Sequence, residues 1–342
     1  MARVKKIVNA IPHLVPEVLE GLVLASHGDL RKLDGADAVV RNHIPDGKVA
    51  LLIGGGSGHE PMYTCYVGKG LADGSVAGNV FAAPTPDIIL EATQAVNRGK
   101  GVIYLYGNYA GDNMNFDIAA ELAAAEDIAV ETIRIADDVV TPERRERRGI
   151  GGAFYVVKCA GTICEETTSL AEAAELIRHA EASVRSIGVA VSAGSLPQTG
   201  MPTFVLGDDE IEIGMGAHGE PGVERRKLMS ADALAEEMTR LVVADLPFRE
   251  GDEVAQGTPL FKVDDAELKA QVARAAANRD LAEQALVRTR QLIADKASSQ
   301  ADLERAEATA RSTQAELDLL ELRLARTTVR APFGGVTGQR MV

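Results

Sequence analysis

The C-terminal part of the chain holds a long stretch without any residue that readily ends a helix. From Leu260 to Ala331 there is neither glycine nor proline, and Phe261 is the only aromatic residue. Because glycine and proline are the strongest helix breakers, their absence predicts long uninterrupted helices. The residues before it are rich in glycine and in short apolar runs, so two kinds of architecture are joined in one chain.

Two helical patterns fill this stretch, at 264–296 and 299–327. In the second pattern an apolar residue recurs every seven positions, at Leu303, Ala310, Leu317 and Leu324. That period is typical of a coiled coil. Ser299 and Asp302 have the spacing of a capping box, which would start the second helix directly after a turn near 297–299. We expect a long antiparallel coiled-coil hairpin.

In the first part, apolar runs alternate with amphipathic stretches. The apolar runs predict buried strands at Val49–Ile53, Gly101–Tyr106 and Ile128–Ile135. The amphipathic stretches predict helices at Asp87–Asn97, Phe116–Ala125 and Ser169–Ser186. This alternation favours an α/β fold with a largely parallel sheet.

We predict three domains from these changes of pattern. Residues 1–190 form a first α/β domain, 191–250 a partial second α/β domain, and 251–342 the hairpin with its short flanking β segments. In the second domain, 202–215 predicts two strands around a turn at 207–209, and Ser230 is expected to cap a helix that runs to Val242.

Charge and cysteine content limit the possible partners and the compartment. With 36 Lys and Arg against 50 Asp and Glu, the net charge of -14 disfavours a nucleic-acid or anionic-membrane surface. No secretory signal follows Met1, and the three cysteines form no CxxC motif. We therefore expect a cytoplasmic protein with no disulfide framework, and we expect Cys159 and Cys164 to be buried and inert.

Three glycine-containing loops carry the chemistry-bearing residues. The first, 54–61, reads Gly-Gly-Gly-Ser-Gly-His-Glu-Pro and follows a predicted strand, so it lies at the sheet edge where open α/β folds bind ligands. His59 could bond a substrate hydroxyl or act as a base, although a tight turn is the alternative for the glycines. The ending of a phosphate-binding P-loop is absent.

The other two loops each offer one reactive side chain. Asp112, in the loop 107–116, is either the N-cap of the next helix or a carboxylate base at the same sheet edge as His59. His218, in the loop 214–222, is flanked by small residues, as a nucleophilic imidazole requires. A structural turn histidine is the alternative.

Together with Gly78–Asp87, these loops resemble the K, or ketose-binding, subunit of the dihydroxyacetone kinase family over about residues 1–248. The resemblance implies that His218 attacks the keto carbon of the substrate and holds it as a hemiaminal. It also implies that His59 and Asp112 orient and deprotonate the terminal hydroxyl, and that Gly56, Ser57 and Gly58 cradle the substrate. Nucleotide and magnesium would be bound by a separate L subunit, not by this chain, with ATP or a phosphotransferase relay as phosphate source. A homodimer is expected.

One position departs from that family's pattern. Many members have a lysine before the Asn-Tyr of the second loop, where this chain has Gly107. We expect the loss of the side chain to enlarge the pocket and to favour a larger ketose such as erythrulose over dihydroxyacetone.

The residues from Gly251 to Val342 resemble a different family, the periplasmic adaptor or membrane-fusion proteins. A Gly-Asp-x-Val segment before the hairpin and an Arg-Ala-Pro-Phe-x-Gly segment after it look like the two halves of a split lipoyl domain. Because K subunits carry a Gly-Asp-x-Val stretch of their own, we hypothesise a chimera joined at 251–254. Its second α/β domain would then be truncated.

Three functions compete at this stage. The leading one is phosphorylation of a ketose held by this chain, and the retained His59, Asp112 and His218 favour it. The others are a non-catalytic ketose-binding regulator and, for the hairpin alone, a structural adaptor of a membrane transport complex.

Overall fold

The computed structural model describes residues 4–246, 253–262, 265–294, 297–330 and 333–336. The chain divides after Leu246 into two compact units, which we call the head and the tail. The predicted boundary between residues 250 and 251 lies outside the described residues. Each unit is described by itself.

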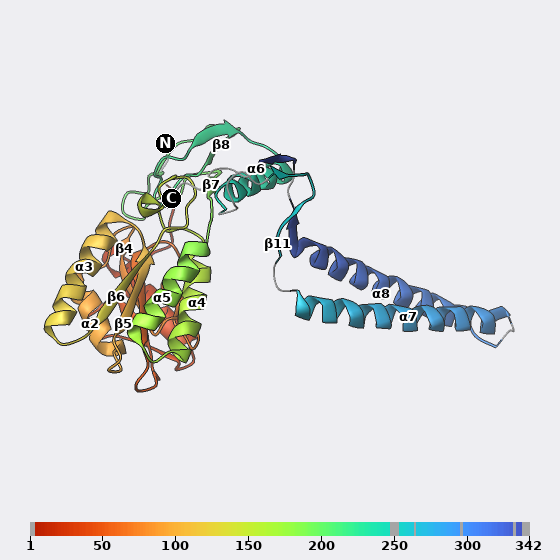
Figure 1. The fold of residues 1–342 in the computed structure, drawn as a ribbon, viewed down its shortest axis with the longest axis horizontal. Coiled ribbons are helices and arrows are strands. Elements are labelled where there is room, and N and C mark those ends of the chain that lie inside the picture. Colours follow the sequence, from red (N-terminus) through yellow and green to blue (C-terminus); the bar gives the residue numbers. More distant parts are fainter. Residues whose placement is uncertain (1–3, 247–252, 263–264, 295–296, 331–332, 337–342) are drawn as a thin grey trace. The chain divides into compact units, whose positions relative to one another are not determined.

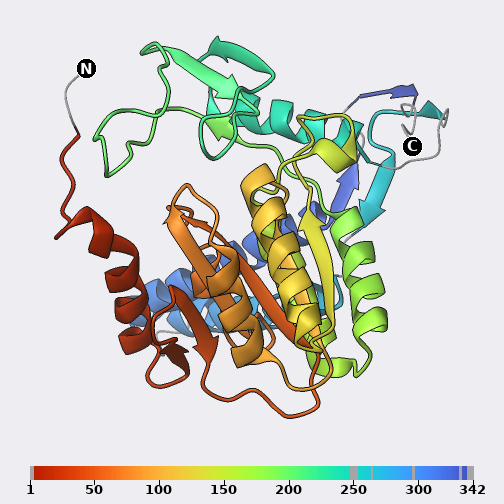
Figure 2. The same cartoon turned by 90° about the vertical axis from the view of Figure 1, so that its left-hand side faces the viewer.

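A six-stranded sheet forms the centre of the head (Figures 1 and 2). Its strand order is β1-β2-β4-β3-β5-β6, and the last four strands in this order run parallel. The strands are β1 (Leu30–Lys32), β2 (Ala38–Arg41), β3 (Ala50–Ser57), β4 (Gly74–Val80), β5 (Val102–Gly107) and β6 (Val130–Ile135). The predicted α/β fold with a largely parallel sheet is therefore present.

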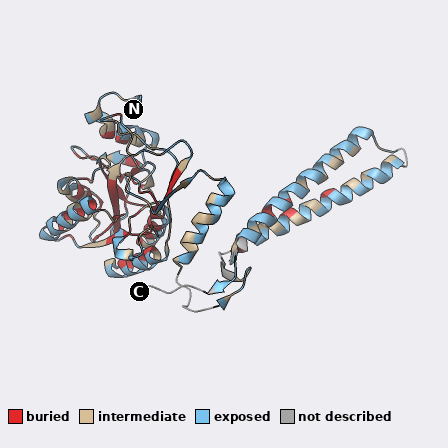
Figure 3. Ribbon diagram, turned by 90° about the horizontal axis from the view of Figure 1, so that it is seen from above, coloured by how far each residue is buried: buried red, intermediate tan, exposed pale blue. Residues whose placement is uncertain are grey.

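Helices cover both faces of this sheet. One face packs against α2 (Pro86–Val96) and α3 (Ala110–Ala125), and the other against α1 (Leu14–Ala25), α4 (Ala153–Glu166) and α5 (Leu170–Ser183). Neighbouring residues of β3 point to opposite faces, so Leu51 belongs to one core cluster and Leu52 to the other. This double burial explains the continuous apolar runs in β3 and β5 (Figure 3).

A smaller antiparallel sheet follows in the head. It contains β7 (Val189–Ala190), β8 (Glu210–Ile213) and β9 (Glu224–Lys227), and α6 (Ala231–Ala244) comes next with Ser230 as its N-cap. The prediction of two strands within 202–215 was wrong, because β8 pairs with β7 and β9 instead of with a strand across the 207–209 turn.

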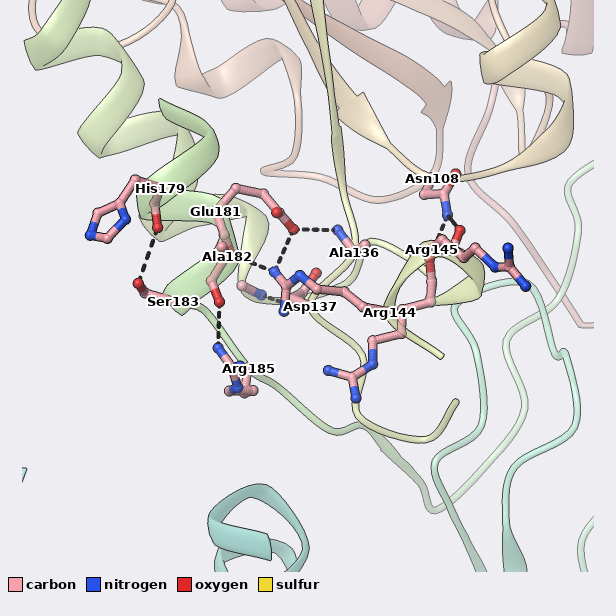
Figure 4. Close-up of polar contacts among 12 residues, drawn as sticks. Asn108, Ala136, Asp137, Arg144, Arg145, His179, Glu181, Ala182, Ser183 and Arg185 are labelled. Carbon is pink, nitrogen blue, oxygen red and sulfur yellow. Dashed lines mark hydrogen bonds and ion pairs between the residues drawn. The ribbon is translucent and has the colours of Figure 1, made fainter. Parts of the chain in front are cut away.

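The loop between β6 and α4 is held by the end of α5 (Figure 4). The carboxylate of Glu181 accepts two hydrogen bonds, one from the backbone N–H of Ala136 at 2.9 Å and one from the guanidinium of Arg144 at 2.7 Å. Further along the loop, the carbonyl of Arg145 accepts the side-chain amide of Asn108 at 3.0 Å. These contacts fix the loop next to the residue that follows β5.

The tail contains two long helices, α7 (Ala266–Ala294) and α8 (Gln300–Arg326), which pack along each other as a hairpin. The capping box of Ser299 and Asp302 is formed as predicted. Ala275, Leu317 and Leu320 are buried in the seam between the helices. The supercoil of a true coiled coil stays a prediction.

Two short antiparallel strand pairs accompany the hairpin. β10 (Glu253–Val254) pairs with β13 (Gly335–Val336), and β11 (Pro259–Lys262) pairs with β12 (Thr328–Arg330). Residues 251–252 and 331–332 of the expected half-lipoyl segments lie outside the described residues, so the lipoyl assignment stays a prediction. Within the described part of the chain, every helix is too short or too polar to span a bilayer.

Candidate functional site

The glycine-rich segment is the end of β3 and not only a loop after it. β3 runs through Ser57, where the sequence pattern ended the strand at Ile53. Its register pairs Gly56 with Gly78 of β4, and the Ser57 hydroxyl donates to the Gly78 carbonyl at 2.7 Å. The pairing with β4 thus fixes the backbone at the sheet edge, directly before His59.

His59 and His218 meet although they are far apart in sequence. Their Nε2 atoms lie 2.8 Å apart, and both rings are half-buried. The Nδ1 of His59 lies 2.7 Å from the carbonyl oxygen of Gly56, and the Nδ1 of His218 lies 2.7 Å from Oε1 of Glu220. Both rings are therefore held at both nitrogens.

The partners of the two Nδ1 atoms determine where the protons lie. A carbonyl oxygen only accepts, so the Nδ1 of His59 carries hydrogen. Although burial opposes the charge on Glu220, hydrogen bonds from the side chain and backbone of His218 outweigh it and lower its pKa to about 2. An ionised carboxylate also only accepts, so the Nδ1 of His218 carries hydrogen. The contact between the Nε2 atoms then requires one further proton, which the pair shares.

His59 binds a proton less tightly than a free imidazole does. Burial lowers the pKa of His59, and the positive charge of His218 lowers it further, against the opposing effect of the Gly56 carbonyl. When the shared proton resides on His59, the Nε2 lone pair of His218 is available, which is the form that a nucleophilic imidazole needs.

Asp112 lies in the first turn of α3, and the N-cap interpretation was wrong. The N-cap residue is Tyr109, without a side-chain capping bond. Asp112 is only 9% exposed, and its buried Oδ1 has no hydrogen-bond partner. Burial raises its pKa to about 6, partly offset by the positive charge of His218. A carboxylate of this kind is suited to take up a proton near neutral pH.

A cavity of about 580 Å³ brings these side chains together. His59, Asp112 and His218 all line it, as do Gly56 and Gly58. Most of the remaining wall is made of small residues, among them Gly55, Ala82, Ala83, Gly111, Gly149 and Ala217. Ser57, which was expected to cradle the substrate, and Gly107, which was expected at the pocket, do not line the cavity.

Aromatic rings hold the imidazole of His218 in place. The ring centroids of Phe81 and Tyr109 lie 5.1 and 4.9 Å from that of His218, in edge-on geometry. Phe81 adopts a φ of 58°, a left-handed conformation that is costly for a residue with a side chain and often found at functional sites. Sequence reasoning gave no role to Phe81, Tyr109 or Glu220, although Glu220 lies two residues after His218 in the same loop.

The expectation that Gly107 enlarges the pocket was wrong. A Cβ atom at this position would lie 2.9 Å from the hydroxyl oxygen of Tyr63 and 3.2 Å from the ring of Tyr109. The Tyr63 hydroxyl also accepts the backbone N–H of Gly107 at 3.0 Å. The space of the missing side chain is therefore filled by tyrosine.

The cysteines and possible metal ligands lie apart from this chemistry. Cys164 is buried, and burial raises its thiol pKa to about 12. Cys159 is exposed, which corrects the prediction that it is buried. Among the described residues, no group of three or more His, Cys, Asp or Glu side chains could hold a metal ion.

Known proteins are similar to this chain over much of its length. The Dak1 domain matches residues 20–258. The dihydroxyacetone-binding subunit DhaK of the PTS-dependent dihydroxyacetone kinase 1 of Listeria innocua is 43% identical over 254 residues, which cover 73% of this chain and 77% of that protein. The D-erythrulose kinase of Mycolicibacterium smegmatis is 40% identical over 204 residues, 59% of this chain and 35% of that protein.

A solved structure shows the same fold. The dihydroxyacetone kinase from C. freundii, in complex with AMP-PNP and Mg2+, superposes with a TM-score of 0.68 at 34% identity. The match covers 78% of this chain and 50% of that one, so this chain corresponds to about half of that enzyme.

Proposed function

Because the chain belongs to the Dak1 domain family, we propose that it is the substrate-binding subunit of a ketose kinase. The observation that carries this proposal is that His59, Asp112 and His218 line one cavity. Nε2 of His218 makes a hydrogen bond to Nε2 of His59, and Oδ1 of Asp112 has no hydrogen-bond partner.

In the first step, the substrate is held covalently. Nε2 of His218 attacks the keto carbon, a nitrogen–carbon bond forms, and the π electrons of the carbonyl move to its oxygen. That oxygen takes the proton that the two histidines share, so it becomes a hydroxyl group. The product is a hemiaminal, which an alcohol such as glycerol cannot form because it has no carbonyl carbon.

In the second step, the terminal hydroxyl oxygen of the held ketose forms a bond to the phosphorus of the donor's phosphoryl group. The bond between this phosphorus and the donor breaks, and its electron pair leaves with the donor. Asp112 accepts the proton of this hydroxyl through its unpartnered oxygen. Covalent attachment fixes the distance and direction of the attacking oxygen, which lowers the entropic cost of the transfer.

The phosphoryl donor would belong to a partner. We propose a separate L-type nucleotide-binding subunit, with ATP or a phosphotransferase relay as the source and magnesium as the ion. A homodimer remains an expectation.

The substrate would be a small ketose. The volume of about 580 Å³ and the small side chains of the wall leave room for a four-carbon ketose such as erythrulose as well as for dihydroxyacetone. This room lies beside Ala82, Ala83 and Gly111 and not beside Gly107.

The tail would have a separate origin. The family match ends at residue 258, so both long helices lie outside it. We propose that head and tail were joined from two families, with the tail derived from an adaptor-type protein. Amplification of the source DNA across residues 240–265 tests this, and one uninterrupted natural gene would contradict it.

The experiment for the main proposal is carbon NMR with dihydroxyacetone and erythrulose, each labelled at the keto carbon. Loss of the carbonyl signal and a new bound tetrahedral carbon are expected, and the His218→Ala variant should show neither. An unchanged carbonyl signal in folded protein would contradict the proposal. Adduct formation without turnover, in the presence of an L-type subunit and donor, would indicate a regulator instead of a kinase subunit.

A further inference from the structure

We propose that Glu220 is a positioning residue that fixes the tautomer of His218 and stabilises the positive charge that the ring acquires when it bonds to the ketose. This inference rests on the proposed function for its second half only. The first half concerns the free protein.

Glu220 holds His218 at two places. Its Oε1 lies 2.7 Å from Nδ1 of the ring, and its Oε2 accepts the backbone N–H of the same residue at 3.0 Å. One carboxylate therefore fixes both the backbone and the ring rotation of His218. With Nδ1 as donor, only Nε2 remains for reaction with a substrate.

The loop is shaped to admit this carboxylate. A Cβ atom on Gly216 would lie 2.2 Å from Oε2 of Glu220, so a side chain at this position would displace the carboxylate. The backbone N–H of Gly216 also donates to the Glu220 carbonyl at 2.9 Å. The Gly-x-His-x-Glu spacing thus closes a tight turn in which the carboxylate lies against the imidazole.

Bond formation at Nε2 of His218 strengthens the interaction between its Nδ1–H and the carboxylate of Glu220. When Nε2 bonds to the keto carbon while Nδ1 keeps its hydrogen, the ring becomes a cation. The other polar groups that face the ring are His59, which carries hydrogen on Nδ1, and Asp112, which is needed for the terminal hydroxyl. Phe81 and Tyr109 supply only ring contacts. Glu220 is therefore the negative charge in direct contact with the new cation.

The first measurement concerns the free protein and needs no ketose. Nitrogen NMR of 15N-histidine-labelled protein, at a pH that removes the shared proton, should show His218 with hydrogen on Nδ1. Glu220→Ala should give the Nε2–H tautomer or a mixture, while Glu220→Gln should keep the wild-type tautomer because its amide oxygen still accepts. An Nδ1–H tautomer unchanged in Glu220→Ala would overturn the positioning role.

The second measurement isolates the charge. Glu220→Gln should weaken formation of the ketose adduct by about 2- to 30-fold, because it replaces a charge-assisted hydrogen bond by a neutral one. The matched control is Glu224→Gln, which removes an exposed carboxylate bonded to Arg226 and should leave the adduct unchanged. A wild-type adduct level in Glu220→Gln would overturn the electrostatic role.

The two measurements separate this inference from the proposed function. If the wild-type protein forms no adduct with either ketose, the proposed function fails, and the tautomer comparison still decides whether Glu220 positions His218. If the adduct forms and Glu220→Gln has no effect on it, only the inference about charge fails.

Discussion

The head and the tail bury their apolar residues in different ways. In the head, Leu51 and Leu52 are fully buried on opposite faces of one strand, against helices that come from distant parts of the chain. Among the described residues of the tail, the two helices bury a narrow seam, which includes Ala275, Leu317 and Leu320. The head is thus stabilised by contacts between distant residues, and the tail mainly by helix formation and one line of contacts. The packing of the head brings residues such as His59 and His218 together.

The largest effect is expected on activity and concerns the head alone. Asp112→Asn should lower turnover by about 10²- to 10⁴-fold, because the amide cannot take up the hydroxyl proton. Adduct formation by the keto-carbon NMR experiment should remain. The control is Asp117→Asn on the same helix, an exposed residue paired with Arg134, which should leave turnover unchanged. Wild-type turnover in Asp112→Asn would remove Asp112 from the mechanism.

Core truncation tests whether the two units are stabilised independently. Leu51→Ala should lower the free energy of unfolding of the head by about 2–5 kcal/mol, through lost burial and a residual cavity. Leu317→Ala, with 4% exposure, should destabilise the tail and leave the head unaffected. Differential scanning calorimetry of the whole chain checks both variants. A common shift of all unfolding transitions in either variant would show that the two units unfold together. The head and the tail would then not be stabilised independently.

The pH dependence sharpens the assignment of the base. Burial raises the pKa of Asp112 to about 6, so the fraction in the basic, ionised form falls as the pH is lowered through this value. Turnover should therefore drop by about tenfold per pH unit below 6. The residual turnover of Asp112→Asn should lack this step. A wild-type profile that is flat from pH 7 to 5 would be inconsistent with an Asp112 base.

A smaller effect is expected at the turn of the hairpin. Ser299→Ala removes the hydroxyl that accepts the backbone N–H of Asp302, and it should destabilise the tail by about 1 kcal/mol. Ser230→Ala removes the matching cap of α6 in the head and is the counterpart. Hydrogen exchange of the amides in the first helical turn is the measurement. Equal protection in wild type and variant would mean that the cap is not needed in the tail.

The smallest effect is expected from removal of the tail. A chain that ends at Leu246 should bind the labelled ketose with an affinity within about twofold of the full chain, because every residue that lines the cavity lies between Gly55 and His218. Titration followed by keto-carbon NMR measures this. A large loss of binding in a head that remains folded would show that the tail supports the site.

The sequence predicted those elements whose pattern is local. The strands β3 and β5 were visible because both of their faces are buried, so each contains a run of apolar residues. β6 was visible from its valine, threonine and isoleucine residues, which favour strands. The cap at Ser299 was visible because its two residues are three positions apart. By contrast, β4 contains glycine, serine and asparagine, which are uncommon in strands. Its sequence therefore carries no strong strand signal. The strands near 202–215 were misplaced because β8 pairs with segments on either side of that range.

The site shows the same limit. His59, Asp112 and His218 were identified from residue type and loop context, and the fold brings them to one cavity. The filling of the Gly107 position by Tyr63 could not be predicted, because it depends on two segments that are 44 residues apart. The shared proton likewise depends on a contact between residues 159 positions apart.

The strand pairs that accompany the hairpin have a consequence for how this tail can change in length. After its two long helices the chain returns to pair Gly335 with Val254, so the hairpin begins and ends at nearly the same point in space. Insertions or deletions of equal length in α7 and α8 would extend or shorten the arm without altering the pairing where it starts. The reach of the arm can therefore evolve, or be engineered, separately from whatever the rest of the chain binds.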